Sequence, residues 1–288
     1  MRVLKGIIRL ARKTTSMISP KLASSIMYRK VMNRKLNLKN PQTFNEKISY
    51  LKLNKYPNDK LIIQCSDKLL VRNYIESKGL SEYLVKLISS YDSVDNIDFD
   101  KLPNKFVLKC NHGCGYNILC KDKNALNKEL TLKKLRKWIR EDFGLVSSEP
   151  HYSKIKRRVI CEEYLEDDIL DYKFFCFEGV PKFFYIAQNV EGDFHNLQQD
   201  FYYPNGELAD FYRTDHNRFS TRPNIPSNLN EMLNIASILS RDFEFVRVDL
   251  FNVSGKIYFS ELTFSPCSGF MPIEPIEKDV EFGNLIKI

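Results

Sequence analysis

The stretch VRVDLFNVSGKIYFSELTFSPCSG, residues 246–269, predicts two strands joined by a turn at Asn252–Gly255. Each strand carries one carboxylate in an otherwise apolar pattern, Asp249 in the first and Glu261 in the second. An unpaired buried carboxylate is costly, but two acids facing each other across paired strands can share a divalent ion such as Mg²⁺. Arg247 lies two residues before Asp249 and therefore faces the same side. This surface fits phosphoryl chemistry, and the alternative is a cross-strand salt bridge between Arg247 and Glu261.

A second candidate site lies in FVLKCNHGCGYN, residues 106–117. Lys109 ends a predicted buried strand, and Gly113 to Gly115 let the backbone approach a ligand closely. Backbone N–H groups of such a loop can surround a phosphate while the lysine supplies the counter-charge. The alternative is a tight turn beside a surface lysine. Further along, the adjacent acids Glu162 and Glu163 close another strand, where they are either solvated or placed beside a nucleoside.

The remaining pattern mixes helices and strands without a regular βαβ order. Thr43 and Glu46 have the spacing of a helix capping box. We expect helices within 20–56, 66–79, 123–144 and 228–243, and strands within 83–92 and 157–168. Residues 99–117 predict a strand followed by a glycine-bearing loop, and 171–189 predict a second hairpin with its turn at Glu178–Pro181. These elements predict an α+β fold with two antiparallel sheets and flanking helices rather than one doubly wound sheet.

The N-terminal segment is strongly basic. Residues 1–40 hold eleven Lys and Arg and no acid, so with a chain total of +8 the remainder sums to 8 − 11 = −3. A charge confined to an arm argues against nucleic acid as the main partner. Val3, Leu4, Ile7, Ile8 and Ala11 fall at helical spacing, which suits an anionic membrane surface. The alternative is a helix packed on the body with a solvated basic face.

The cysteines indicate a reducing compartment. Seven cysteines, an odd number, follow no signal peptide, which predicts reduced thiols in a cytosolic protein. Cys110, His112, Cys114 and Cys120 have a metal-like grouping, but no second Cys/His pair follows at a finger-like distance. Buried small residues beside a loop are the favoured interpretation.

Five stretches resemble the teichuronopeptide-type (TupA-like) family of the ATP-grasp superfamily, and 246–270 also resembles D-alanine–D-alanine ligases. They are NPQTFNEKISYLKL (40–53), DKLLVRNYI (67–75), FDKLPNKFVLKCNHGCGYN (99–117), EEYLEDD with DYKFFCFEG (162–168 and 171–179), and FVRVDLFNVSGKIYFSELTFSPCSGF (245–270). The resemblance covers residues 40–288. It implies an ATP-grasp fold with two α+β lobes that hold ATP between their sheets, after a helical basic arm at 1–40. We expect lobes at 41–164 and 165–288.

The resemblance also implies roles for individual residues. Phosphate contacts fall to Lys109, to Gly113 and Gly115 of a lid, to Lys173, and to Lys68 in the helix after Asp67; His112 either contacts phosphate or caps the turn. Glu162, Glu163 and Leu165 belong to a hinge beside adenine, and Asp171 matches the acid that holds the ribose. Asp249 and Glu261 hold Mg²⁺, while Arg247 stabilises the acyl phosphate and the tetrahedral intermediate. Thr263 stands where the wider superfamily has a metal-binding Asn, which leaves the number of metals open.

The resemblance finally implies a function in capsular or cell-wall polysaccharide synthesis. An ATP-dependent carboxylate–amine ligase would join an amine donor, such as an amino acid, to a sugar uronic acid. The enzyme would be cytoplasmic, with the basic arm holding it at the inner membrane face near lipid-linked precursors. The rivals are a glycosyltransferase, for which DFD at 98–100 is the one metal-type motif, a sugar phosphotransferase, and a non-catalytic nucleotide-binding scaffold. The acceptor pocket is expected at 192–213.

Overall fold

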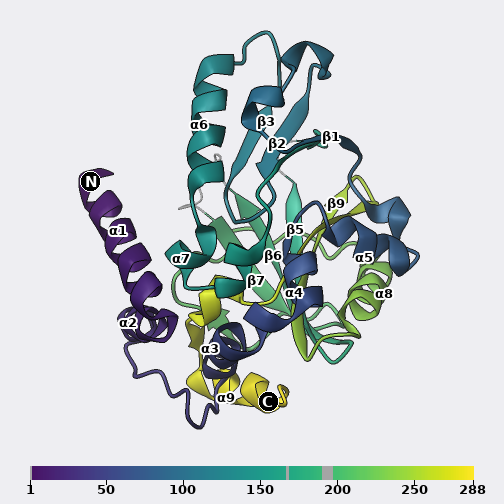
Figure 1. The fold of residues 1–288 in the computed structure, drawn as a ribbon. Coiled ribbons are helices and arrows are strands. Elements are labelled where there is room, and N and C mark those ends of the chain that lie inside the picture. Colours follow the sequence, from purple (N-terminus) through teal and green to yellow (C-terminus); the bar gives the residue numbers. More distant parts are fainter. Residues whose placement is uncertain (1, 167–168, 190–196) are drawn as a thin grey trace.

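A computed structural model of the chain describes residues 2–166, 169–189 and 197–288 (Figure 1). The side chains of residues 2–7, the Asp167–Asp168 part of the expected acidic bend and residues 192–196 of the expected acceptor pocket lie outside the described part. The described residues form two main antiparallel sheets, a short two-stranded sheet and flanking helices, so the predicted α+β class is confirmed. Within the described ranges, no helix is both long and apolar enough to span a bilayer.

The larger sheet has five strands in the order β10-β9-β5-β6-β7. They are β5 (Leu170–Phe177), β6 (Val180–Asn189), β7 (Leu197–Tyr202), β9 (Phe245–Val253) and β10 (Lys256–Thr263). Both predicted hairpins are present, and their turns fall at Glu178–Gly179 and Ser254–Gly255. All four residues of these turns have positive φ, which explains a glycine in each.

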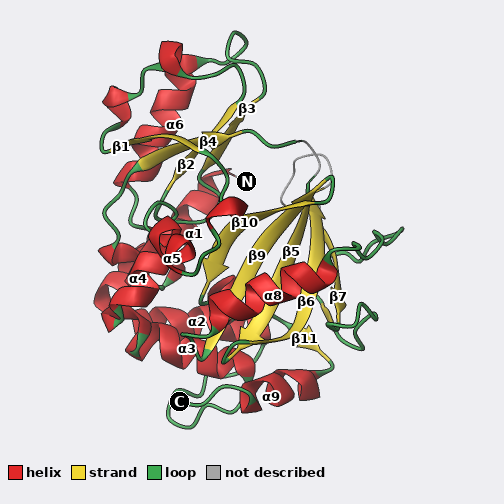
Figure 2. Ribbon diagram, turned by 90° about the vertical axis from the view of Figure 1, so that its right-hand side faces the viewer, coloured by secondary structure: helices red, strands yellow, loops and turns green. Residues whose placement is uncertain are grey.

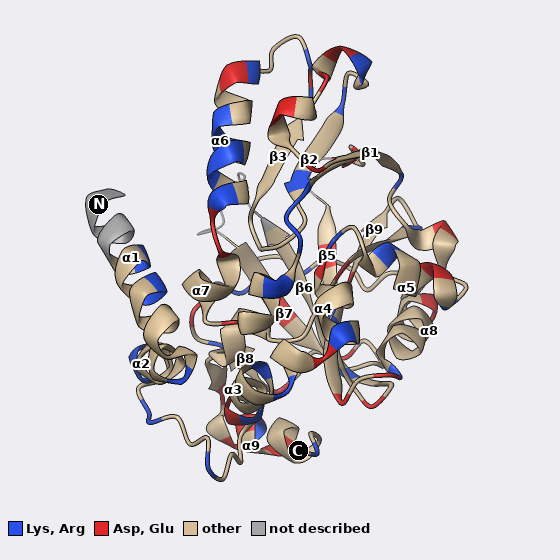
Figure 3. Cartoon of the chain, in the orientation of Figure 1, with Lys and Arg blue, Asp and Glu red and all other residues tan. Residues whose placement is uncertain are grey.

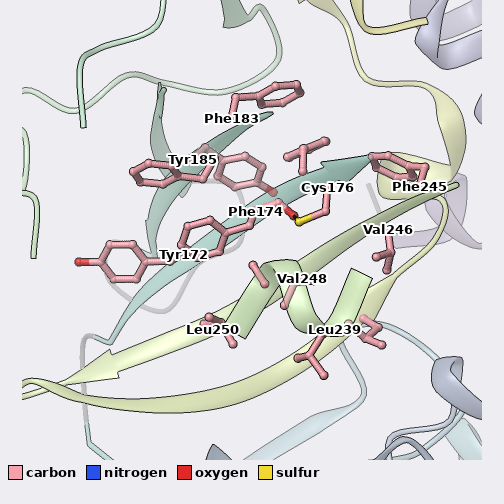
Figure 4. Close-up of a cluster of buried hydrophobic side chains, with 14 of the residues drawn as sticks. Tyr172, Phe174, Cys176, Phe183, Tyr185, Leu239, Phe245, Val246, Val248 and Leu250 are labelled. Carbon is pink, nitrogen blue, oxygen red and sulfur yellow. Dashed lines mark hydrogen bonds between the residues drawn. The ribbon is translucent and has the colours of Figure 1, made fainter. Parts of the chain in front are cut away.

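The two faces of this sheet have different partners. Helix α8 (Leu229–Ser240) crosses one face (Figure 2) and covers apolar side chains, among them Phe174 and Val248, which lie close to Leu239 of α8 (Figure 4). On the other face, Phe175 and Phe245 pack against Phe44 of α3 (Phe44–Asn54). Because strand side chains alternate, the same face further along carries charged residues instead of apolar ones.

The smaller sheet has four strands in the order β1-β4-β2-β3. They are β1 (Leu87–Tyr91), β2 (Phe106–Cys110), β3 (Asn117–Cys120) and β4 (Val159–Glu163). Helix α6 (Lys128–Arg140) packs on this sheet through Leu135 and contributes to a separate hydrophobic core. This lobe lies beyond one end of the larger sheet (Figure 2).

The other helices are α1 (Arg2–Ile18), α2 (Pro20–Met32), α4 (Lys60–Ser66), α5 (Val71–Ser77), α7 (Phe143–Ser147) and α9 (Ile276–Asn284). A short sheet pairs β8 (Tyr212–Arg213) with β11 (Ile273–Glu274). The capping box predicted for Thr43 and Glu46 is present at the start of α3. Residues 44–80 share a hydrophobic core with residues 172–286, and the expected division at residues 164 and 165 stays a prediction.

Two predicted helices differ in the structure. Helical structure does not run through 20–56, because Asn33 takes a left-handed conformation that ends α2 and residues 33–43 are irregular. The helix predicted for 66–79 is also divided, with α4 ending at Ser66 and α5 beginning at Val71. Asp67 accepts hydrogen bonds from the backbone of Leu69 and Leu70, which fixes a turn between the two helices. Lys68 therefore lies in a turn and not in a helix.

Candidate functional site

A row of polar side chains crosses the middle of the larger sheet. Glu261 pairs with Asp249, Asp249 with Lys173, and Lys173 with Tyr185, on four neighbouring strands. A β-bulge between Phe259 and Glu261 decides which side Glu261 faces. In a regular ladder Ser260 would pair with Asp249, and Glu261 would pair with Val248 and point toward α8, because a one-residue slip reverses every side chain. The opposed acids that the sequence suggested are thus present.

Basic side chains neutralise these acids. Arg247 donates from Nε and Nη2 to the two carboxylate oxygens of Asp249 at 2.7 and 2.6 Å. Its Nη2 also lies 3.0 Å from Thr263 Oγ1 and 3.4 Å from Glu261 Oε1. Lys173 Nζ lies 2.5 Å from Asp249 Oδ2 and 2.5 Å from Asp171 Oδ2, on the same face of the sheet. The salt bridge that the sequence left as an alternative, Arg247 to Glu261, is therefore formed in the structure.

The turn between α4 and α5 completes this cluster. Lys68 Nζ donates to Glu261 Oε2 at 2.9 Å, across 193 residues of chain. The backbone N–H of Lys68 donates to the Asn111 carbonyl at 3.0 Å, which ties the turn to the strand that bears Lys109. Lys68 thus bridges the two lobes at the cluster, although the helix expected to carry it is absent.

Burial and neighbouring charges shift the pKa values of the ionisable side chains in this cluster. Burial, helped by the neighbouring Asp249, raises the pKa of Asp171 to about 6. Burial would also raise the pKa of Glu261, but Lys68, Lys173 and Arg247 hold it below its ordinary value. In the opposite sense, Asp171 and Asp249 raise the pKa of Lys173 although burial alone would lower it. Glu261 and Lys173 therefore stay ionised at neutral pH.

Lys109 and Glu162 form the part of the site contributed by the small lobe. Lys109 Nζ lies 2.7 Å from Glu162 Oε2, and Arg72 Nη1 lies 3.5 Å from the other oxygen of the same carboxylate. Glu162 is buried, so its carboxylate is not simply solvated. Lys68, Arg72, Lys109 and Glu162 line one narrow space between the lobes. Arg72 was not predicted as a site residue, although DKLLVRNYI places it four residues after Lys68.

An apolar pocket of about 150 Å³ adjoins Lys109. Its lining includes Val85, Val107, Leu119, Tyr164, Leu165, Ile169 and Phe251, with Lys109, Asn117, Glu163 and Glu166. The expected hinge residues Glu163 and Leu165 are therefore at this pocket, and Glu162 faces Lys109 beside it. A flat apolar ligand group held here would leave its charged part beside the lysines of the cluster.

The glycine loop connects β2 to β3. Gly115 has φ +74°, and a Cβ on Gly113 would lie 2.9 Å from ring atoms of Phe143 and Tyr116. The His112 ring is buried, and its Nε2 lies 3.2 Å from the Glu141 carbonyl oxygen. Burial lowers the pKa of His112, so the ring is neutral. These contacts favour support of the turn over phosphate contact, the two roles that the sequence left open for His112.

The donor set fits a magnesium ion that takes part of its coordination from a phosphate. Asp249, Glu261 and the Thr263 hydroxyl place hard oxygen atoms on one surface, within reach of the same Arg247 nitrogen. Among the residues that the structure describes, no group of three or more His, Cys, Asp or Glu side chains could hold a metal. Two carboxylates are enough for Mg²⁺, because this ion commonly binds one or two carboxylates together with phosphate oxygens and water.

A family model described as TupA-like ATPgrasp matches residues 46–287 of the chain. No curated protein matches the sequence. Among solved structures, a D-alanine–D-alanine ligase from Bacillus anthracis is 16% identical with a TM-score of 0.45, over 77% of this chain and 64% of that one. The corresponding enzyme from Helicobacter pylori is 16% identical with a TM-score of 0.44, over 86% and 70%. An L-amino acid ligase from Bacillus licheniformis is 13% identical with a TM-score of 0.45, over 76% and 47%. The chain thus spans less than two thirds of the first and third of these proteins.

Proposed function

Since the chain belongs to the TupA-like ATP-grasp family, we propose that it is an ATP-dependent carboxylate–amine ligase of capsular or cell-wall polysaccharide synthesis. The observation that carries this proposal is the cross-strand pair of Asp249 and Glu261, which three cations contact close to an apolar pocket. These cations are Lys68, Lys173 and Arg247. The cations suit a triphosphate and the pocket suits adenine. No side chain is required as a nucleophile, because the reaction consists of aligning reactants and neutralising charge.

In this proposal the pocket holds the adenine, with hinge residues Glu163 and Leu165 at its wall. Lys109 contacts the phosphates from the small-lobe side and Lys68 from the turn between α4 and α5, and the loop with Gly113 and Gly115 covers them. Lys173 contacts phosphate from the larger sheet. For these lysines to bind phosphate, their present ion pairs with Glu162, Glu261 and Asp249 must loosen, which a more highly charged partner can bring about.

Asp249 and Glu261, with Thr263 beside them, would hold Mg²⁺, and the ion would supply charge neutralisation at the phosphate oxygens. In the reaction, the substrate carboxylate attacks the γ-phosphorus of ATP, and ADP leaves. The amine then attacks the acyl phosphate, and inorganic phosphate leaves as the amide forms. Arg247 would stabilise the negative charge that develops in both steps, since its guanidinium already lies between the two acids.

A hydroxyl-rich acceptor is supported by unpartnered polar atoms beside this row. Asp171 and Gln199 flank Ala187 on adjacent strands of the larger sheet. In the described part of the chain, Asp171 Oδ1 and both amide atoms of Gln199 are buried without a hydrogen-bond partner. Buried polar groups normally find partners. Hydroxyls of the ATP ribose would provide one for Asp171, the role that the resemblance implies, and hydroxyls of a sugar acceptor would provide them for Gln199. The proposed acceptor is a uronic acid and the proposed amine donor is an amino acid. The proposed place of the reaction is the cytoplasmic face of the membrane.

Calorimetry of ATP with Mg²⁺ tests the site directly. We expect Asp249→Asn and Glu261→Gln each to weaken binding at least about tenfold, because each removes a charged contact. Asp279→Asn is the matched control, since Asp279 is as buried as Asp249 and pairs with Arg34 and Asn45 away from the cluster. Binding that is absent in the native chain, or unchanged in both site variants, would refute the ATP site. Formation of an amide in addition to ADP separates a ligase from a phosphotransferase or glycosyltransferase.

A further inference from the structure

The first two helices form an arm on one side of the molecule, with the N-terminus at its free end (Figure 1). The arm, residues 8–32 for the side chains described, carries basic residues on both helices (Figure 3). These are Arg9, Arg12, Lys13, Lys21, Arg29 and Lys30. The sequence contains no Asp or Glu before residue 46, so no acid of the arm itself offsets this charge.

The arm also exposes large apolar side chains. Ile18 is 78% exposed, Leu10 and Met17 are 65% exposed, and Ile26 is 54% exposed. Leu22 and Val31 are exposed as well. Helices that only packed against the body would turn such residues inward, so their exposure indicates a surface that another partner covers.

A groove of about 200 Å³ runs between the two helices. It is lined by Ile8, Ala11 and Arg12 from α1 and by Ile26, Met27 and Lys30 from α2. On each helix these positions follow the three-and-four spacing of one helical face. The groove therefore combines an apolar floor with one cation from each helix.

We infer that the arm is a docking surface for a bilayer that contains anionic lipids. Its apolar side chains would enter the acyl region while Arg12, Lys30 and the other cations contact lipid phosphates. A second copy of the chain is a poorer partner, because a symmetric contact would bring together two surfaces that carry cations and no acids. Nucleic acid would satisfy the cations but leave side chains such as Ile18 without a function.

The arm is attached to the body beside the proposed nucleotide loop. Arg9 Nε donates to Glu141 at 2.6 Å, and Arg9 Nη2 lies 3.1 Å from the Tyr116 hydroxyl, one residue beyond Gly115. Ser16 and Ser148 share a hydrogen bond of 2.6 Å. A membrane-bound arm would therefore hold the small lobe close to the lipid surface. Lipid docking does not depend on the proposed ligase activity. A chain that does not bind vesicles would refute the docking and would not bear on the ligase.

Sedimentation of the full chain with vesicles tests this surface. We expect pelleting with vesicles of phosphatidylcholine plus phosphatidylglycerol, little with phosphatidylcholine alone, and loss of binding at high salt. The double variant Arg12→Glu with Lys30→Glu should bind at least about tenfold more weakly, since each cation near an anionic surface contributes. Leu22→Ser with Ile26→Ser should also weaken binding, with the charge unchanged.

Lys101→Glu with Lys287→Glu is the matched control, because both lysines are exposed outside the arm and the change in charge is the same. This control should bind like the native chain. Equal binding to both kinds of vesicle, no binding to either, or an equal loss in the control would overturn the inference. Self-association that Leu22→Ser with Ile26→Ser abolishes, without vesicle binding, would identify the surface as a contact between copies instead.

Discussion

Two buried ionisable residues, Lys52 and Glu149, lie at the loop that follows β10. Lys52 on α3 is fully buried, and its Nζ donates to the Ser268 carbonyl at 2.6 Å and lies 4.2 Å from the centre of the Phe270 ring. Glu149 is buried nearby and accepts hydrogen bonds from Ser265 and Ser268. Burial lowers the pKa of Lys52 to about 7, although Glu149 opposes the shift. The loop after β10 is thus held by a base whose charge changes near neutral pH.

This predicts a pH dependence of stability that Lys52→Met removes. Between pH 7 and 10.5 the unfolded chain keeps a proton on Lys52 that the folded chain has released. The free energy of unfolding of the native chain, relative to Lys52→Met, should therefore rise with pH by up to about 1.4 kcal/mol per unit in this window and level off below it. Urea unfolding of both proteins across this range measures the difference. A flat difference would show that Glu149 keeps Lys52 charged.

Among the elements, α3 and β10 show how local signals position the site. The capping box at Thr43 starts α3 at a fixed residue, so Phe44 enters the core and Lys52 reaches the loop after β10. In β10, the bulge before Glu261 turns this acid toward the cations. A helix start and a one-residue irregularity in a strand therefore decide which side chains reach the site.

Thr43→Ala should lower the free energy of unfolding by about 1 kcal/mol, because the N-terminal backbone of α3 loses its side-chain acceptor. Thr14→Ala is the control. Its hydroxyl donates to the Leu10 carbonyl on the exposed surface of α1 and caps no helix. Denaturant unfolding followed by circular dichroism compares the two variants. Equal effects would indicate that the capping box contributes nothing to the stability of the fold.

At the scale of the whole molecule, the site depends on the meeting of two lobes. The small lobe supplies Lys109 and Glu162, the larger sheet supplies Lys173, Arg247, Asp249 and Glu261, and Lys68 contacts both parts. A ligand bound between the lobes therefore adds contacts that neither lobe can make alone. Such a ligand should stabilise the folded chain by mass action.

ATP with Mg²⁺ at about a hundred times its dissociation constant should raise the free energy of unfolding by about 2.7 kcal/mol. Lys109→Met should weaken this protection, since a charged hydrogen bond to phosphate contributes about 1.5–3 kcal/mol, or about ten- to hundredfold in affinity. Lys105→Met changes an exposed lysine four residues earlier and should keep the full stabilisation by ATP with Mg²⁺. Thermal unfolding with and without ligand gives both comparisons. If ATP with Mg²⁺ stabilised Lys109→Met as much as the native chain, Lys109 would not be a phosphate contact.

The sequence by itself determined the α+β class, both hairpins, the capping box at Thr43 and the opposed acids Asp249 and Glu261. All of these follow from residues close together in the chain, whose spacing sets which face each side chain occupies. Only the tertiary structure decided that Lys68 pairs with Glu261, that Arg72 pairs with Glu162 and that His112 contacts the Glu141 carbonyl just after α6. These contacts join residues as many as 193 positions apart, and the pairing of distant charges depends on how the lobes pack, which local spacing does not encode.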